Sequence, residues 1–266
     1  MAFEDKGERL EKDALGEISV PGDVYWGAAT RRALDNFPVS GIRFDIEFIR
    51  AVALIKRCAA QVNRNTGLLE KQTAEAVIQA AEEIMEGKLD DQFPLDIFQT
   101  GSGTSTNMNV NEVIASRANE ILTGEKGGKT PVHPNDHVNL GQSSNDVIPS
   151  ALHIAACVMI KFRLLPALQQ LEETLEEKAE RFTDILKIGR THLQDAVPVF
   201  LGEEFGSFAR QVELGAERVR TARDGLKELA LGGTAVGNGV NAPAGFAQEV
   251  IRLVSEHTGI DFRRAG

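Results

Sequence analysis

Residues 152–182 read LHIAACVMIKFRLLPALQQLEETLEEKAERF. Apolar residues recur along this stretch at intervals of three and four, a spacing that predicts a long helix with one apolar face. Pro166 lies in the middle of the stretch and should kink or briefly break the helix, because proline cannot donate a backbone hydrogen bond. The positions on the apolar face are Leu152, Ala155, Ala156, Met159, Leu168, Leu171, Leu175, Ala179 and Phe182.

The same periodicity predicts helices through residues 74–85, 110–122 and 205–229. Strand-like alternation is almost absent; one short extended stretch covers residues 17–20 and ends in a Pro-Gly turn. Residues 231–239, LGGTAVGNG, contain four glycines and should form an irregular connection. We therefore predict a mainly α fold.

The predicted helices differ in length on the two sides of residue 140. We expect a small mixed N-terminal domain over residues 1–140 and a domain of long helices over residues 141–266. Helices this long, with apolar faces and few partners within the chain, are typical of a helical bundle that is completed elsewhere. The second domain is therefore expected to be part of a long-helix bundle.

The composition excludes several classes of protein. The chain has 266 residues, of which 42% are hydrophobic and 26% charged, so it is neither disordered nor fibrous. With 29 basic and 39 acidic residues its net charge is −10, which argues against nucleic acid or an anionic membrane as a partner. No apolar signal region begins the chain and no run approaches ~18 apolar residues. We expect a cytoplasmic protein in which an anionic ligand, if there is one, is bound by a local site against the overall negative charge.

Cysteine and histidine spacing gives no metal site. Cys58 and Cys157 lie in apolar stretches and are expected to be buried free thiols. His133 and His137 are four residues apart, but Pro134 between them disfavours a regular helix, and no glutamate occupies the position that zinc proteases require. The GKT triplet at 128–130 lacks the earlier glycine of a phosphate-binding loop. We expect no metal and no nucleotide.

Three segments place several small polar residues where a long helix is predicted to begin. They are residues 100–105 (TGSGTS), 142–146 (QSSND) and 189–195 (GRTHLQD). Such residues commonly cap a helix, but capping needs one of them and each segment supplies several. The open N–H groups and the positive end of the helix dipole also bind anions. Three such helix ends that converge would suit a small dicarboxylate.

His192 is the one histidine set among these polar groups. A structural hydrogen-bonding role and a catalytic role are both compatible with its position. An imidazole beside bound carboxylates titrates near neutral pH, which suits a group that transfers protons.

Six motifs in order resemble those of class II fumarases in the fumarase/aspartase superfamily, over residues from about 16 to the end of the chain. The motifs are QTGSGT at 99–104, NMN at 107–109, HPND at 133–136, SSND at 143–146, GRTH at 189–192 and GGTAVG at 232–237. The resemblance implies a lyase of the tricarboxylic acid cycle that interconverts fumarate and L-malate without a cofactor. It also implies a homotetramer around a shared helical bundle, in which three chains form each active site.

The resemblance assigns roles by position. The residues that would bind the substrate carboxylates and the catalytic water are Ser102, Thr104, Ser143, Ser144, Asn145, Thr191 and His192, with His192 also a candidate for proton transfer. A second anion site would involve His133, Asn135 and Asp136. The family often has a basic residue three places before that histidine, where this chain has Thr130 beside Lys129.

One family motif is absent from these 266 residues. Family members carry a later Gly-Ser-Ser-x-Met-Pro-x-Lys-x-Asn segment, whose serine is the favoured base and whose lysine binds substrate. We therefore expect the isolated chain to have little or no hydratase activity. Two alternatives stay open: an aspartate ammonia-lyase, whose members usually show Gly-Gly-Ala-Gly-Thr near residues 100–104, and a non-catalytic truncated fragment that only binds dicarboxylates or oligomerises.

Overall fold

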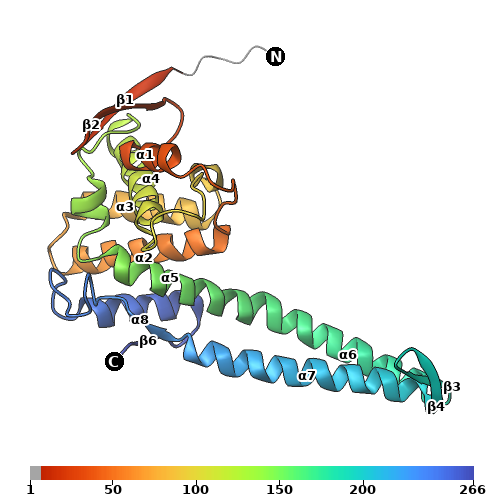
Figure 1. The fold of residues 1–266 in the computed structure, drawn as a ribbon. Coiled ribbons are helices and arrows are strands. Elements are labelled where there is room, and N and C mark those ends of the chain that lie inside the picture. Colours follow the sequence, from red (N-terminus) through yellow and green to blue (C-terminus); the bar gives the residue numbers. More distant parts are fainter. Residues whose placement is uncertain (1–6) are drawn as a thin grey trace. The chain divides into compact units, whose positions relative to one another are not determined.

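The computed structural model describes residues 7–266, and by internal contacts it separates into two compact units (Figure 1). Unit 1 comprises the described residues up to Ala155 together with Lys227–Gly266, and unit 2 comprises Ala156–Leu226. The predicted division at residue 140 does not coincide with these units and stays a prediction. The expectation of no signal region concerns residues 1–6, which lie outside the described part of the chain.

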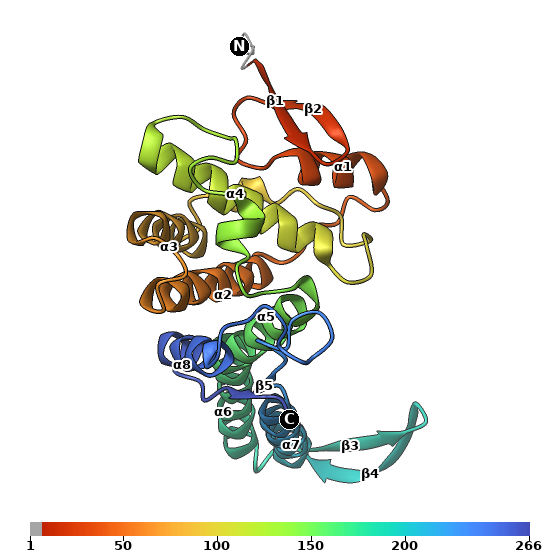
Figure 2. The ribbon, with the colours of Figure 1, turned by 90° about the vertical axis from the view of Figure 1, so that its left-hand side faces the viewer.

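Unit 1 is built on helix α2, whose inner face is fully buried. Helix α2 packs against α3, α4 and α8, and Figures 1 and 2 both show α2 beside α3. The helices are α1 (Ala28–Asn36), α2 (Ile46–Asn65), α3 (Lys71–Met85), α4 (Thr104–Thr123), the greater part of α5 (Ser144–Met159) and α8 (Phe246–Thr258), with a 3-10 turn at Asp90–Gln92 and a π-helical turn at Pro134–Val138.

Two small sheets complete unit 1. Strands β1 (Glu8–Asp13) and β2 (Gly16–Pro21) form an antiparallel hairpin, and β5 (Glu228–Leu229) pairs in parallel with β6 (Arg263–Arg264). The predicted extended stretch at 17–20 lies in β2, and residues 230–245 are irregular, as the glycines predicted.

Cys58 and Cys157 are buried free thiols, as expected.

Unit 2 contains two long helices and a hairpin. Helix α5 changes to a π-helical turn at Ile160–Leu164, and α6 (Leu165–Arg181) begins one residue before Pro166. The chain stays helical through Pro166, so the predicted break does not occur, and the irregularity is the π-helical turn just before it. Helix α7 (Leu201–Gly225) packs along α6. A side chain at Gly202 would place its Cβ 2.5 Å from the carbonyl oxygen of Ala179, so the two helices meet closely there.

The predicted helix through residue 229 is shorter than expected. Helix α7 ends at Gly225, since glycine disfavours continuing the helix, and Leu229 instead pairs with Arg264 in the small parallel sheet. The remaining predicted helices, within α3, α4 and α5–α6, are confirmed, and so is the mainly α fold class.

The prediction that residues 189–195 open a long helix is wrong. They lie in an antiparallel hairpin of β3 (Leu186–Thr191) and β4 (Gln194–Phe200), and α7 begins only after it. His192 and Leu193 form the two-residue turn with φ of 48° and 63°. Both central residues therefore adopt the left-handed region that a tight hairpin of this handedness requires. Apolar and polar residues alternate only weakly along these strands, so the sequence pattern gave little sign of them.

The expectation that no apolar run is long enough for a membrane helix needs correction. Ser144–Arg181 forms a 38-residue helical stretch with an 18-residue window of mean hydropathy 1.6, which is long and apolar enough to cross a membrane. Only 22% of that window is buried within the chain. Length and composition do not separate a membrane span from a bundle helix with an uncovered apolar face.

Glu112 of α4 fixes the start of α1. Its buried carboxylate accepts hydrogen bonds from the backbone N–H groups of Gly27, Ala29 and Thr30 at 2.8–3.1 Å and from the Thr30 hydroxyl at 2.7 Å. These N–H groups have no partner within their own helix, because the first turn of any helix leaves them open. A side chain in the third turn of one helix therefore caps another.

We expect Glu112→Gln to lower the free energy of unfolding by about 2–4 kcal/mol, because the amide loses one acceptor and turns an N–H₂ group toward buried donors. Urea unfolding followed by circular dichroism measures the change. Glu75→Gln on the exposed face of α3 is the matched control and should change stability by less than about 0.5 kcal/mol. Equal effects of the two variants would contradict the capping role of Glu112.

Candidate functional site

The N-termini of α4 and α5 lie next to each other in unit 1. Asn107 in the first turn of α4 donates from Nδ2 to the hydroxyl of Ser144, the first residue of α5, at 3.1 Å. A Cβ at Gly103 would lie 3.0 Å from Ile148 Cγ2 in α5, so glycine is what allows this approach. Two of the three predicted polar segments are thus brought together.

The start of α4 presents a cluster of hydroxyl groups. The N-cap is Gly103, with φ of 66° and no capping side chain of its own. Gln99 instead accepts from the backbone N–H and the hydroxyl of Thr106, both at 3.0 Å. Ser102 and Thr104, the predicted ligands, are exposed, and their hydroxyl oxygens are 2.9 Å apart. The first N–H groups of α4 and these hydroxyls can act as donors to an anion.

The start of α5 is held by a reciprocal capping pair. The backbone N–H of Ser143 donates to Asp146 Oδ1 at 2.9 Å, and the Ser143 hydroxyl accepts from the N–H of Asn145 at 3.3 Å. The other oxygen of Asp146 accepts from the N–H groups of Gly232 and Thr234. Asn145 donates from Nδ2 to the carbonyl of Ala235 at 2.8 Å. The glycine-rich segment 231–239 is thereby attached to the predicted ligands Ser143 and Asn145.

A buried polar network lies behind these two helix ends. Asn139, which follows the π-helical turn, accepts at Oδ1 from Lys56 Nζ at 2.8 Å, from Asn107 Nδ2 at 3.2 Å and from Asn111 Nδ2 at 3.3 Å. Lys56 comes from the buried face of α2 and is fully buried, which lowers its pKa to about 7 despite the opposing charge of Asp146.

Asp96 fixes the chain that leads into the α4 start. Its carboxylate accepts from the N–H groups of Ser40 at 2.5 Å, Gly41 at 2.7 Å and Phe98 at 2.8 Å. Burial acts to raise the pKa of Asp96, but these hydrogen bonds and that from the Ser40 hydroxyl outweigh it and lower the pKa to about 2. The Asp96 carbonyl also accepts from Gln99 Nε2 at 2.8 Å, which positions the amide that caps α4.

The predicted second anion site forms a turn of its own. His133 is the N-cap of the π-helical turn, and its Nδ1 accepts from the backbone N–H groups of Asn135 at 3.2 Å and Asp136 at 3.1 Å. Burial lowers the pKa of His133, although the Asp136 carboxylate 3.3 Å away opposes this. Nδ1 is therefore occupied within the turn, which leaves Nε2 as the ring atom that can donate to a ligand.

Thr191 and His192 belong to unit 2 and are exposed at the tip of the β3–β4 hairpin. Leu193, beside them, is 94% exposed. Two non-glycine residues in the left-handed region carry backbone strain, and such strain commonly accompanies functional positions. The hairpin thus presents His192 outward.

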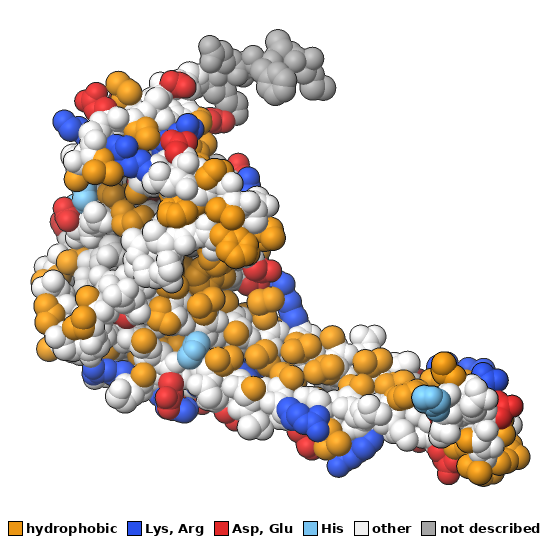
Figure 3. Space-filling view, viewed as in Figure 1, with side chains coloured by type: hydrophobic (Ala, Val, Ile, Leu, Met, Phe, Trp, Pro, Cys, Tyr) orange, Lys and Arg blue, Asp and Glu red, His pale blue; other side chains and the backbone are white. Residues whose placement is uncertain are grey.

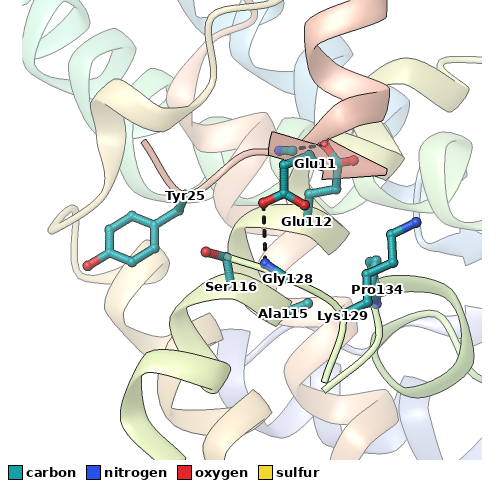
Figure 4. Close-up of a pocket in the computed structure, with 9 residues that line it drawn as sticks. Glu11, Tyr25, Glu112, Ala115, Ser116, Gly128, Lys129 and Pro134 are labelled. Carbon is teal, nitrogen blue, oxygen red and sulfur yellow. Dashed lines mark hydrogen bonds between the residues drawn. The ribbon is translucent and has the colours of Figure 1, made fainter. Parts of the chain in front are cut away.

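Two cavities lie near the predicted residues. One of about 10 Å³ lies between β1 and α4, where Figure 4 shows the Glu11 carboxylate accepting from the N–H of Gly128, with Glu112 next to Glu11; it has room for a single water and not for a dicarboxylate. The second, of about 210 Å³, adjoins the loop at Thr100. Its walls include Phe44, Phe48, Ile97, Ile148 and Leu152, so it offers mainly apolar contacts. Within residues 7–266, no cluster of three or more His, Cys, Asp and Glu side chains could hold a metal.

The network also contains residues whose role the sequence did not reveal. Lys56, Asn139 and Asp146 position the α5 start, yet none of them was predicted as a functional residue. The signal for Lys56 was a lone lysine within the apolar run AVALIKRCAA at 51–60. The motifs did contain Asp146 and Asn107, but the pattern alone gave no reason to separate a positioning residue from a ligand.

The sequence profile of a protein family described as lyase matches residues 16–265 of the chain. The chain belongs to this lyase family. It is 54% identical over 257 residues to the class II fumarate hydratase of Halobacterium salinarum, an alignment that covers 97% of this chain and 54% of the relative. The mitochondrial fumarate hydratase of Danio rerio is 53% identical over 256 residues, with 96% and 50% covered. The chain spans about half the length of these curated relatives.

Solved structures of lyases have the same fold. A recombinant class II fumarase from Schistosoma mansoni superposes with a TM-score of 0.90 at 40% identity, covering 95% of this chain and 53% of that one. A fumarate lyase:delta crystallin from Brucella melitensis gives a TM-score of 0.92 at 40% identity, with 98% and 57% covered. The resemblance to class II fumarases inferred from the motifs is confirmed.

We expect Asp96→Asn to destabilise the protein at pH 7 and to have progressively less effect in acid. The folded pKa of about 2 lies below the ordinary aspartate value, so the carboxylate stabilises the fold above about pH 4 and that contribution is lost as the pH falls toward 2. Urea midpoints of both proteins across this range measure the convergence. Asp261→Asn, at an exposed position, is the control, and a difference that persists unchanged at pH 2 would refute the role of the carboxylate charge.

Proposed function

We propose that the protein contributes to a fumarate hydratase, which interconverts fumarate and L-malate. The observation that carries the proposal is the junction of the α4 and α5 N-termini, where Asn107 contacts Ser144 and the paired hydroxyls of Ser102 and Thr104 lie at the start of α4. Hydroxyl, amide and open N–H donors gather there on a chain whose net charge is −10. This arrangement suits a small dicarboxylate, and relatives more than half identical in sequence carry that activity in their names.

The proposed reaction starts with removal of a proton from C3 of malate. The electron pair left on C3 spreads onto the adjacent carboxylate, and hydroxide then leaves C2 with a proton from an acid. Fixed donors directed at that carboxylate stabilise the charge that develops, as in an oxyanion hole. We assign Ser102, Thr104, Ser143, Ser144, Asn145 and Thr191 to binding, and His192 to proton transfer through a water molecule. No cofactor enters this scheme.

We further propose that the active protein is a homo-oligomer, a tetramer as in the family, in the cytoplasm. Large apolar side chains of unit 2 remain uncovered: Phe162, Leu164, Leu171 and Phe208 are 42–55% exposed. Figure 3 shows hydrophobic side chains along the α5–α6 stretch. Burying such faces between copies would remove apolar area from water. In this proposal the hairpin of one copy brings Thr191 and His192 to the α4–α5 junction of another.

The turn at His133 supports a second, weaker anion site. Its Nε2, with Asn135 and Asp136 beside it, would act from the π-helical turn, and Lys129 would stand in for the missing basic residue at 130. Because Asp136 is 76% exposed at its side chain and carries negative charge, this site should favour anions less than the α4–α5 junction.

The test joins this chain to the part of the Halobacterium salinarum relative that lies outside the aligned residues. Fumarate absorbance follows malate dehydration and fumarate hydration in the joined protein and in the chain alone, and ammonia release from aspartate is measured in parallel. We expect turnover of malate and fumarate by the joined protein without ammonia release. Ammonia release alone would favour an aspartate ammonia-lyase, and no turnover of either substrate would overturn the proposed activity.

We expect Ser144→Ala in the joined protein to lower kcat/KM for malate about 100-fold, the usual effect of removing one donor to the developing charge. Ser207→Ala, on the exposed face of α7, is the matched control and should leave kcat/KM unchanged. Stability of both variants is compared by urea unfolding. An effect of Ser144→Ala no larger than that of the control would contradict its assignment.

A further inference from the structure

Lys56 is a buried cation without a carboxylate in hydrogen-bond contact among the described residues. Its side chain is fully buried, and its ammonium donates to the neutral amide oxygen of Asn139 at 2.8 Å. Asp146 acts on it only through its charge, because both Asp146 oxygens are held by the backbone N–H groups of Ser143, Gly232 and Thr234. A buried ammonium without a close counterion is unfavourable and is rarely kept without a reason.

The amides around Lys56 connect it to the α4–α5 junction. From the ammonium, successive contacts of 2.8, 3.2 and 3.1 Å lead through Asn139 Oδ1 and Asn107 Nδ2 to the hydroxyl of Ser144. The side-chain oxygens of Asn63, Asn107 and Asn111 are buried and have no hydrogen-bond partner in the described part of the chain. Among the described residues, the polar interior behind the two helix ends therefore has spare acceptors, and Lys56 supplies its positive charge.

We infer that Lys56 is a positioning residue whose ammonium acts as the buried counter-charge for a dicarboxylate at the α4–α5 junction, so that ligand binding and protonation of Lys56 are coupled. This inference rests on the proposed function and deepens it. The ligand does not touch Lys56; its charge acts through Ser144, Asn107 and Asn139, which the ammonium holds in place. The residue thus supplies local positive charge on an acidic chain.

The coupling has a definite sign. Burial holds the pKa of Lys56 near 7 in the free protein, and a bound dianion favours the charged form and raises that pKa. Between the free and bound pKa values, binding takes up a proton, and affinity falls as the pH rises through this range. At pH 7 a fraction of the free molecules carries an uncharged Lys56, so binding should take up a corresponding fraction of a proton per ligand.

The groups packed around Lys56 leave it as the main acceptor of this proton. Its hydrogen-bond partner, Asn139, is an uncharged amide, and so are Asn107 and Asn111 of α4, which donate to the same oxygen; from α5 the charge of Asp146 acts on it. On α3 and α8, Glu82, Glu256 and His257 act on Arg57 or its surroundings and not on Lys56. His133 caps the π-helical turn and His192 lies in the hairpin turn. Any proton uptake that remains in the Lys56→Met variant is therefore assigned to groups other than Lys56.

The experiment is calorimetric titration of fumarate into the chain at pH 7 in buffers of different ionisation enthalpy, which yields the protons taken up. Lys56→Met should abolish this proton uptake and weaken binding at pH 6 at least about tenfold, while its affinity becomes nearly independent of pH between 6 and 8.5. Lys56→Arg keeps the charge at every pH and should restore affinity without proton uptake. Lys71→Met, at an exposed position on α3, is the control and should behave as the unaltered chain.

The outcomes separate this inference from the proposed function. Binding by the unaltered chain with no proton uptake, or with the same uptake in Lys56→Met, overturns the role of Lys56 alone. Failure of the unaltered chain to bind fumarate overturns this inference together with the proposed dicarboxylate site. A second measurement, the NMR titration of the Lys56 side chain without ligand, should give a midpoint near pH 7, and an ordinary lysine midpoint would overturn the inference even if Lys56→Met fails to fold.

Discussion

A single amide oxygen, Oδ1 of Asn139, organises the interior beneath the candidate site. It accepts from Lys56 on α2 and from Asn107 and Asn111 on α4, although a carbonyl oxygen has two lone pairs. Its own amide nitrogen donates to the carbonyl of Gln142, just before α5. Three parts of the chain are therefore aligned by one side chain, and the relative position of the α4 and α5 ends follows from it. Buried polar groups of this kind are costly unless paired, so they permit little variation in geometry.

The helices were predictable because their signal is local. Apolar residues at intervals of three and four specify a buried helix face whatever it packs against, and the faces of α3, α4 and α6 were read directly from it. The β3–β4 hairpin was missed because its residues alternate only weakly and its turn, His192-Leu193, lacks the Asn-Gly or Gly-Gly pair that announces such turns. A polar segment before a long helix has the same residue types whether it caps that helix or forms the turn of a hairpin that precedes it.

The sequence predicted the residues proposed to bind the ligand but not the residues that hold them in place. Ser102, Thr104 and Ser143–Asn145 were identified because hydroxyl and amide residues cluster in sequence at helix starts. Gln99 caps α4 from seven residues away and Glu112 caps α1 from more than eighty, so such partners have no fixed spacing. Lys56 is the extreme case: in sequence it interrupts an apolar run, and only the tertiary packing of α2 against the Asn139 turn gives it a partner.

The charge balance of the chain gives Lys56 its significance. Ten net negative charges repel a dicarboxylate, and most arginines in the described part of the chain already pair with acidic side chains, as Arg117 does with Glu83. Helix N-termini offer only partial charges to offset that repulsion. A full charge placed behind them acts through a medium with little water, where its field is screened less than that of a surface lysine. Burial therefore has two consequences with one cause. It makes the Lys56 ammonium unfavourable in the free protein, and it makes the attraction of that ammonium for a bound anion stronger.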